Sequence, residues 1–473
     1  MTDTLARPSD RPEPIPAAAL ADLAAAFHGR ILGPDDEDYA AARAVWNGMI
    51  DRYPAVVARC ADTADVATAL AFGRAHGLPI AVRGGGHSVA GNGTVDSGVV
   101  IDLSDINACT VDAQNRVVDV GGGARWAAVD AATAEHGLAT TGGLVSTTGV
   151  GGLTLGGGIG WLMRRQGLAC DNLVEAETVL PNGEQIVASE TVEPDLFWGL
   201  RGGGGNFGIV TRFRFRLAPI GMVIGGMFLH RRDDAARILA EWQDLTSDAP
   251  DELTTLAALI TAPPAPFIPA ELQGQPILAI VVCWSGEPEA GERALAGLRR
   301  LGPPAVDLVG PMPYVALQSM LDEGAPDGLR NYWKSGQVRG LDATTIERLI
   351  DSAATMPSLM SQIHIHQLGG AVDRVAADAT AYPHRGASHT INLISTWTRP
   401  HHDPENVAWA QDAFTAIEPA LHGAYANFLG NEGEERIRSA YGEANLQRLA
   451  ALKARFDPDN ILRLNQNVRP PGR

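Results

Sequence analysis

Short apolar runs alternate with amphipathic stretches near the start of the chain. Residues 55–59 (AVVAR) and 78–82 (LPIAV) have the composition of buried strands, and residues 64–76 between them carry apolar positions at helical spacing. Asp62 or Thr63 suits the N-cap of that helix, and a glycine follows its last turn. The pattern therefore predicts a β-α-β unit whose second strand leads directly into a run of glycines.

Similar patterns predict further elements in the first half of the chain. The predicted helices cover residues 17–27 and 126–136, and the predicted strands cover residues 99–103, 117–123 and 209–217. The last of these strands, IVTRFRFRL, alternates apolar and charged positions, which is typical of a strand with one buried face.

The hydrophobic pattern changes in the middle of the chain. Longer apolar runs predict strands at residues 277–284, 361–368 and 388–397, and amphipathic stretches predict helices at 233–244 and 288–301. Strands mixed with helices in this way indicate an α+β unit, whose sheet can present alternate side chains to a ligand.

The composition and charge argue against two classes of binding partner. The chain has 473 residues, of which 45% are hydrophobic and 19% charged, and its formal net charge is −18. This length predicts about two folding units. The negative charge argues against nucleic acid and against an anionic membrane surface, because both require a basic face. A small-molecule substrate is the expected partner, and nothing in the sequence assigns an oligomeric state.

Location and redox chemistry are equally plain. The first residues, MTDTLARPSDRPEPIP, lack a basic start followed by an apolar core, and no later segment has the length and apolarity of a membrane span. We therefore expect a cytoplasmic protein. Cys60, Cys109, Cys170 and Cys283 are scattered without metal-ligand spacing, so we expect reduced thiols and neither a metal site nor disulfides.

The glycine run after the second strand is the first candidate for chemistry. Arg83 precedes Gly84, Gly85 and Gly86, and His87 follows at once. Glycines allow successive backbone N–H groups to approach a phosphate closely, so the run indicates an anion cradle. It is not a Rossmann fingerprint, because a turn-rich stretch and a strand follow it instead of a helix. The G-x-G-x-x-G match at residues 203–208 also leads into a strand.

Four motifs in order carry a family resemblance. They are the histidine-bearing glycine loop, GGLTLGGGIGWLMRRQGLACDNL (151–173), DLFWGLRGGGGNFGIVT (195–211) and FDPDNILRLNQNV (456–468). In this order they resemble the FAD-linked oxidases of the berberine bridge enzyme-like branch of the vanillyl-alcohol oxidase superfamily.

The resemblance implies an α+β fold with two parts. A PCMH-type FAD-binding domain, itself of two parts, would be joined to a mixed α/β substrate domain with an antiparallel sheet over the flavin. We expect a tail and helix at residues 1–30, the FAD-binding domain at 31–220 and the substrate domain at 221–418. A berberine bridge-like segment at 419–473 would then return to the FAD-binding domain.

The resemblance also implies how FAD is attached. The family's histidine is linked to a methyl group of the flavin ring, which makes His87 the expected covalent attachment point. Many members add a cysteinyl link in a C-P-T-V-G-V-G-G motif, but here VSTTGVGG places Val145 at the cysteine position. A valine cannot form this bond, so we expect a single link through His87. Cys170 lies downstream and is interpreted as a packing cysteine.

The remaining FAD contacts are implied residue by residue. Arg83, Gly84, Gly85, Gly86, His87 and Ser88 would line the pyrophosphate, and Thr147, Thr148, Gly149, Gly151 and Gly152 would continue along it. Asp171 and Asn172 would lie near the ribityl or adenosine portion, Ile209 near adenine, and Asn465 and Asn467 near the flavin ring.

The candidates for catalysis come from the C-terminal part. Tyr425 and Asn427 resemble the Tyr-x-Asn element that carries a catalytic tyrosine in sugar- and alcohol-oxidising members. Asn392 lies where alkaloid-oxidising members place a carboxylate base, and an amide cannot accept a proton. Tyr382 is a further candidate close by. Because a phenol ionises near pH 10, Tyr425 must either have its pKa depressed or lose its proton in concert with hydride departure.

Several histidines remain. His384 and His389 lie near Tyr382 in the sequence and could face substrate. His364 and His366 share one face of the strand predicted at 361–368. Histidines in such positions are more often exposed or held in the core, and that is our expectation for this pair.

The expected reaction is the oxidation of an alcohol, such as a sugar, a hemiacetal or a glycosylated natural product. Hydride would pass to the covalently bound flavin, and O2 would reoxidise it to give H2O2. The first alternative is oxidation of a C–N bond of an amine or alkaloid, as in hydroxynicotine oxidases. The second is a flavoprotein that steers a cyclisation without net turnover of oxygen.

Overall fold

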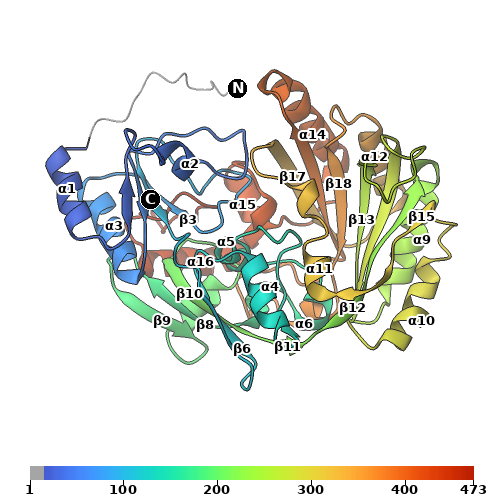
Figure 1. Ribbon diagram of the computed structural model, residues 1–473, viewed down its shortest axis with the longest axis horizontal. Helices are drawn as coiled ribbons and strands as arrows, with labels where there is room; N and C mark the ends of the chain where they lie inside the picture. Colours follow the sequence, from blue (N-terminus) through green and yellow to red (C-terminus); the bar gives the residue numbers. More distant parts are fainter. Residues whose placement is uncertain (1–14, 473) are drawn as a thin grey trace.

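The computed structural model describes residues 15–472 and contains two small sheets and one large one (Figure 1). The first small sheet has the order β1-β2-β4-β3, in which β2, β4 and β3 are parallel and β1 is antiparallel to β2. Its strands are β1 (Arg30–Leu32), β2 (Val56–Arg59), β3 (Ile80–Arg83) and β4 (Val99–Asp102). This sheet confirms the predicted strands of the β-α-β unit.

The helix of that unit, α3 (Thr63–Ala75), begins at the predicted cap. The Asp62 carboxylate accepts hydrogen bonds from the backbone N–H groups of Ala64 and Asp65, which satisfies two free donors of the first turn. Gly77 follows with φ of +63°, the left-handed conformation that ends many helices. The short helix α1 (Ala17–Ala25) also lies where the pattern placed it. Residues 1–14, on which the expectation about a leader sequence depends, lie outside the described residues.

The second small sheet is antiparallel and has the order β5-β6-β10-β8-β9. Its strands are β5 (Cys109–Asp112), β6 (Val117–Gly121), β8 (Leu173–Val179), β9 (Gln185–Ser189) and β10 (Ile209–Arg216). The alternation in β10 has the predicted cause, because Phe213 and Phe215 are buried whereas Arg212 and Arg214 face the other side and pair with Asp119. A two-stranded pair, β7 (Leu138–Ala139) and β11 (Ala218–Pro219), lies beside it.

Short helices surround this sheet and carry the glycine-rich segments. They are α2 (Tyr39–Arg43), α4 (Trp126–Ala134), α5 (Val150–Leu155), α6 (Met163–Gln166), α7 (Ala169–Asn172) and α8 (Pro194–Leu200). Trp126 of α4 packs against Phe215 of β10, so this helix is fixed on the core face of the sheet.

The large sheet is antiparallel and follows the order β15-β12-β14-β13-β18-β19-β17, with β16 also paired to β12. Its main strands are β12 (Met222–Arg231), β13 (Leu253–Thr261), β14 (Pro276–Trp284), β17 (Arg330–Val338), β18 (Gln362–Gln367) and β19 (His389–Trp397), and its short ones are β15 (Val306–Asp307) and β16 (Gly310–Pro313). The strands predicted from the long apolar runs correspond to β14, β18 and β19, whereas β12, β13 and β17 extend the sheet beyond the prediction.

Four long helices cover one face of this sheet, whereas the short helix α11 (Tyr314–Gln318) packs on the other face against β12, β13 and β14 (Figure 1). The long helices are α9 (Ala235–Ser247), α10 (Pro288–Leu298), α12 (Ala343–Ala354) and α14 (Asp403–Ile417). Ile363 and Ile365 of β18 and Leu393 of β19 belong to the core beneath these helices. Because strand side chains alternate, the residues between them must point to the opposite face, toward the first half of the chain.

The chain returns to the first half through α15 (Glu434–Tyr441) and α16 (Glu443–Phe456). Lys453 of α16 is fully buried and pairs with Asp457 at 2.6 Å. Its ammonium group also donates hydrogen bonds to the carbonyls of Asn206 and Leu462, at 2.8 and 2.9 Å. This buried cation therefore ties the C-terminal segment to the glycine-rich loop before β10.

Two further short helices are α11, whose Tyr314 and Leu317 are buried, and α13 (Ala371–Arg374). Within residues 15–472, no helix has the length and apolarity to cross a bilayer.

Candidate functional site

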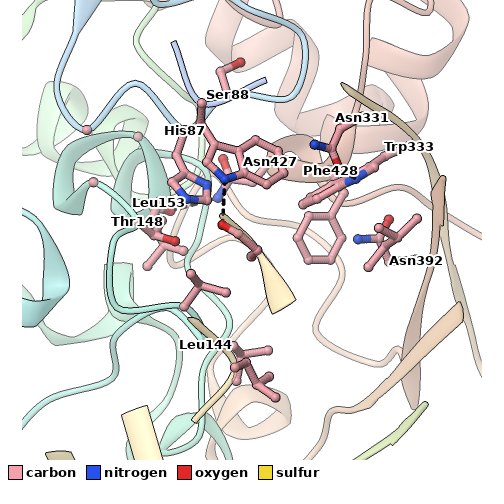
Figure 2. Close-up of a pocket in the computed structure, with 18 of the residues that line it drawn as sticks. His87, Ser88, Leu144, Thr148, Leu153, Asn331, Trp333, Asn392, Asn427 and Phe428 are labelled. Atoms are coloured by element: carbon pink, nitrogen blue, oxygen red, sulfur yellow. Dashed lines mark hydrogen bonds between the residues drawn. The ribbon is translucent and has the colours of Figure 1, made fainter. Parts of the chain in front are cut away.

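A cavity of about 1360 Å³ lies where the two halves of the chain meet. Its lining combines the glycine loop after β3, the start of α5, the free face of the large sheet and the C-terminal segment. Figure 2 shows His87, Ser88 and Thr148 on one side of this space and Trp333, Phe428 and Asn392 on the other. Ligand pockets usually measure about 300–1,000 Å³, so this cavity suits an extended cofactor together with a substrate.

The floor of the cavity is formed by two glycine segments packed backbone to backbone. A Cβ atom on Gly85 would lie 2.4 Å from the Cα of Gly149, and Gly86 has φ of +70°. Side chains are therefore excluded here for steric reasons, which leaves main-chain groups to face a ligand. Arg83 lines the cavity, but its guanidinium group pairs with the buried Asp102 at 2.5 Å. We infer that it fixes the loop.

His87 lies at the end of this loop, on the cavity wall. Its ring stacks on Trp46 with a centroid distance of 4.6 Å, and its Nε2 atom lies 3.2 Å from the Thr147 hydroxyl. Burial lowers the pKa of His87 to about 4. The imidazole is therefore neutral at physiological pH, and one ring nitrogen keeps a free lone pair.

The phenol oxygen of Tyr425, on the cavity wall, accepts several hydrogen bonds. It accepts them from the backbone N–H groups of Gly158 and Ile159, at 3.0 and 3.2 Å, and from the Asn427 amide at 2.9 Å. Burial raises the pKa of Tyr425 to about 12, although these three donors act in the opposite direction. Three N–H groups converging on one oxygen form an arrangement that stabilises an oxyanion.

Comparison with known proteins identifies the family of this fold and site. The family described as FAD binding domain matches residues 54–189, and the one described as Berberine and berberine like matches residues 424–469. An uncharacterised FAD-linked oxidoreductase of Bacillus subtilis is 31% identical over 449 residues, which cover 93% of this chain and 97% of that protein. The chain belongs to the berberine bridge enzyme-like FAD-linked oxidoreductases.

Further berberine bridge enzyme-like and related proteins agree with this assignment. (R)-6-hydroxynicotine oxidase of Paenarthrobacter nicotinovorans is 29% identical over 94% of this chain and 98% of its own length. The crystal structure of 6-hydroxy-D-nicotine oxidase from Arthrobacter nicotinovorans superposes with a TM-score of 0.84 at 25% identity, covering 93% of this chain and 98% of that chain. The expected fold, an FAD-binding domain joined to a second domain with an antiparallel sheet, is confirmed.

The cavity fits the FAD that this berberine bridge enzyme-like family binds. Asn465 lines the cavity, and its side-chain oxygen is buried without a partner among the described residues. Such an orphaned acceptor is costly unless a ligand donates to it. Together with the glycine floor and the neutral His87, it suits a long ligand that carries both phosphates and a polar ring.

Most residues assigned to FAD from the sequence line the cavity. Those that do so are Arg83, Gly84, Gly85, Gly86, His87, Ser88, Thr148, Gly149, Gly151, Gly152, Ile209 and Asn465. Thr147 reaches the site only through its contact with His87, and Asn467 lies outside the lining. These contacts with FAD stay predictions.

Asp171 and Asn172 lie elsewhere. The Asp171 carboxylate forms a buried two-pronged ion pair with Arg385, with both N–O distances at 2.7 Å. Asn172 donates to the backbone carbonyls of Gln166 and Leu168. Neither side chain is part of the cavity lining, so their position does not support the predicted contact with the ribityl or adenosine portion.

The catalytic candidates separate in the same way. Tyr425 and Asn392 line the cavity, but Tyr382 does not. The Tyr382 hydroxyl accepts a hydrogen bond from Gln337 at 2.7 Å, and its ring packs edge-on against that of Tyr425. Its catalytic role therefore stays a prediction that the position does not support. His384 and His389 also lie outside the lining, and Cys170 is buried as expected of a packing cysteine.

Sequence reasoning missed the wall opposite the glycine loop. His364 and His366 were expected to be exposed or held in the core, but both line the cavity on the free face of the large sheet. Trp333 of β17 and Phe428 pack edge to face beside them. The signal was present, because Ile363 and Ile365 alternate with these histidines and had to face the helices. This alternation indicates a cavity wall only when it is known which face of the sheet the helices cover.

Proposed function

We propose that this FAD-dependent oxidoreductase is an oxidase that removes hydride from a hydroxyl-bearing carbon and uses O2 as the acceptor. The net reaction converts an alcohol and O2 to a carbonyl compound and H2O2. The observation that carries this proposal is the three-donor environment of the Tyr425 oxygen. An alcohol must lose its hydroxyl proton as hydride leaves its carbon, and Tyr425 is the side chain equipped to receive it.

Each residue has a defined task in this reaction. FAD, when bound, supplies the acceptor for the hydride. The phenolate form of Tyr425 takes the substrate proton, and the N–H groups of Gly158, Ile159 and Asn427 stabilise the negative charge that its oxygen carries before the transfer. Asn392, one of whose side-chain atoms is buried without a partner, can orient the substrate by hydrogen bonding but cannot act as a base.

Replacing Tyr425 with Phe tests this assignment. We expect anaerobic flavin reduction to slow by about 10²-fold or more, which is the usual contribution of a positioned proton acceptor. The visible spectrum of the bound flavin should not change. Tyr314→Phe is the matched control, because Tyr314 is also buried but does not line the cavity. Unchanged reduction in Tyr425→Phe would remove this residue from the mechanism.

We further propose that His87 holds FAD covalently and that no cysteine contributes. The neutral imidazole supports this proposal, because a free ring nitrogen can attack an electrophilic carbon. Val145 lines the cavity and has no reactive atom. After acid precipitation, the yellow colour should remain with the wild-type protein and pass to the supernatant in His87→Ala. Colour that stays with the His87→Ala pellet would overturn the link.

Oxidation of an amine is the second candidate. It is supported by the hydroxynicotine oxidase among the relatives, whereas Asn392, an amide where alkaloid-oxidising members carry a carboxylate base, counts against it. A neutral amine can lose hydride with little help from a base, so an amine substrate whose oxidation is insensitive to Tyr425→Phe would favour this candidate. Release of H2O2 with any substrate would argue against a flavoprotein that only steers a cyclisation.

A further inference from the structure

The free face of the large sheet is graded from polar to apolar along its strands. Gln362, His364 and His366 follow one another on the cavity face of β18, and Met360 precedes them. A strand rises about 3.3 Å per residue, so about 13 Å separates Gln362 from His366 along β18, and Met360 lies in the turn before Gln362. The two ends of this wall have opposite chemistry.

The deep end is polar and uncharged. The Nε2 atom of His366 and the side-chain oxygen of Asn392 are both buried and have no partner among the described residues. Burial keeps the pKa of His366 well below its usual value, so its imidazole is neutral. Both side chains can therefore exchange hydrogen bonds with a neutral ligand, and leaving them unpaired would be costly.

This deep end lies beside the reaction centre. Phe428 packs against the ring of His366 at 5.7 Å and against the ring of Tyr425 at 4.8 Å. A molecule whose hydroxyl reaches Tyr425 therefore lies within reach of the histidine and asparagine groups. The polar groups of β18 and β19 and the predicted proton acceptor define one subsite.

The mouth is apolar although it is open to solvent. Phe267, Leu359 and Met360 are 52%, 73% and 37% exposed, and all three line the cavity. Phe267 follows β13, and Leu359 and Met360 precede β18. Because β13 pairs antiparallel with β18, the segment after β13 lies next to the segment before β18. Exposed apolar side chains gathered at one site usually mark a binding surface.

The segment that carries Phe267 is a braced loop. Ala262 and Gly274 hydrogen bond across its base, and the Gln273 side chain donates to the carbonyls of Ala265 and Ile268. Ile268 and Leu272 are buried beneath it against the sheet. The loop is therefore a fixed part of the entrance, and the exposure of Phe267 is built into the fold.

We infer that the substrate is a neutral, elongated amphiphile, with its hydroxyl-bearing end at Tyr425, His366 and Asn392 and an apolar body along the wall to Phe267, Leu359 and Met360. This inference rests on the proposed oxidation of an alcohol. A free oligosaccharide fits poorly, because its hydroxyls would lose water against the apolar side chains of Phe267, Leu359 and Met360, which offer no hydrogen bond. A charged substrate is disfavoured by the neutral deep end.

Binding of straight-chain alcohols to the holoenzyme tests this inference without requiring turnover. Displacement of the neutral dye Nile red by butanol, octanol, dodecanol and hexadecanol gives a dissociation constant for each. We expect tightening of about fourfold per methylene group, which corresponds to full burial of each one. In Leu359→Ser/Met360→Ser, the gain should fall between dodecanol and hexadecanol, whose chains are long enough to reach the mouth, and remain between butanol and octanol. Leu245→Ser, which alters an exposed leucine outside the cavity, is the matched control.

The two ends of the site give separable results. His366→Leu should weaken all the alcohols by a similar factor and leave the gain per methylene unchanged. The inference would be overturned if affinity did not rise with chain length in the wild type, or if it rose equally in the wild type and in Leu359→Ser/Met360→Ser. Tighter binding of xylobiose than of octanol would overturn it as well. If affinity still rises with each methylene group but no alcohol is oxidised, the proposed reaction would be overturned. The conclusion that the ligand has an apolar body would remain.

Discussion

Two opposing effects act on the ionisation of the Tyr425 phenol. Its oxygen receives three N–H donors, which favour the phenolate, while complete burial favours the neutral phenol. Burial prevails, with the pKa of Tyr425 raised to about 12. The donors therefore do not create a resting phenolate at neutral pH. They lower the cost of forming the phenolate, which must be present before Tyr425 can take the substrate proton.

This balance predicts a pH dependence. Below its pKa of about 12, each unit of rising pH makes the proton-accepting form of Tyr425 about tenfold more abundant. The rate of anaerobic flavin reduction at saturating substrate should therefore increase with pH across the stable range and reach no plateau below about pH 10. Asn427→Leu, which removes one donor, should lower the rate at every pH. A rate that does not change with pH would show that the phenolate of Tyr425 is not needed for hydride transfer.

At the scale of elements, the outline of the fold follows from local patterns. The helix predicted at 126–136 is Trp126–Ala134, and the strand predicted at 209–217 is Ile209–Arg216, because each has its own periodicity and its own flanking glycines. The glycine floor was also predictable, since the residue type itself is the signal. β17 was not recognised as a strand, because its sequence RNYWKSGQV mixes polar and apolar positions without a clear period.

The cavity wall shows the limit of such reasoning. Period two places His364 and His366 on one face, but it does not say whether that face meets helices, solvent or a cavity. The answer comes from α12 and α14, which cover the opposite face. Asp171 shows the reverse case, because its partner Arg385 is 214 positions away in the sequence and only the fold brings them together.

The attachment of α16 predicts an effect on stability. Lys453→Met would leave the buried Asp457 without its cation, which should cost about 3–5 kcal/mol in the free energy of unfolding. The change should also loosen Asn465 and speed the loss of non-covalent FAD in a His87→Ala background. Urea denaturation and flavin fluorescence measure the two effects. Adding Asp457→Asn should restore part of the stability, because it removes the unpaired charge and keeps one of the two oxygens that accept from the N–H groups of Ile461 and Leu462.

At the scale of the whole molecule, buried histidines make the fold sensitive to acid. Burial lowers the pKa of His87 and His364 to about 4 and that of His389 to about 3, whereas in the unfolded chain each would take up a proton near pH 6.5. Between pH 6.5 and 4 the unfolded state therefore binds more protons than the folded state. Stability from these groups is fully present above pH 6.5 and is lost as the pH falls.

The melting temperature of the apoprotein between pH 7 and pH 4.5 measures this loss. We expect His389→Phe to flatten the decline, because His389 lies outside the cavity and carries one of the largest shifts. Substitution of the exposed His136 should leave the decline unchanged. An equally steep decline in His389→Phe would show that other groups dominate the response to acid.

The cavity is assembled from segments far apart in the chain, with the glycine loop at residues 84–88 and Asn465 and Gln466 several hundred positions later. During synthesis, the glycine loop emerges from the ribosome long before Asn465 and Gln466. A nascent chain can fold its first sheets in that interval, but it cannot complete the cavity around FAD. Cofactor loading is therefore a step that waits for synthesis to pass residue 466, and a product truncated before Asn465 lacks part of the site. The yellow colour of a preparation would then report synthesis beyond this point as well as correct folding.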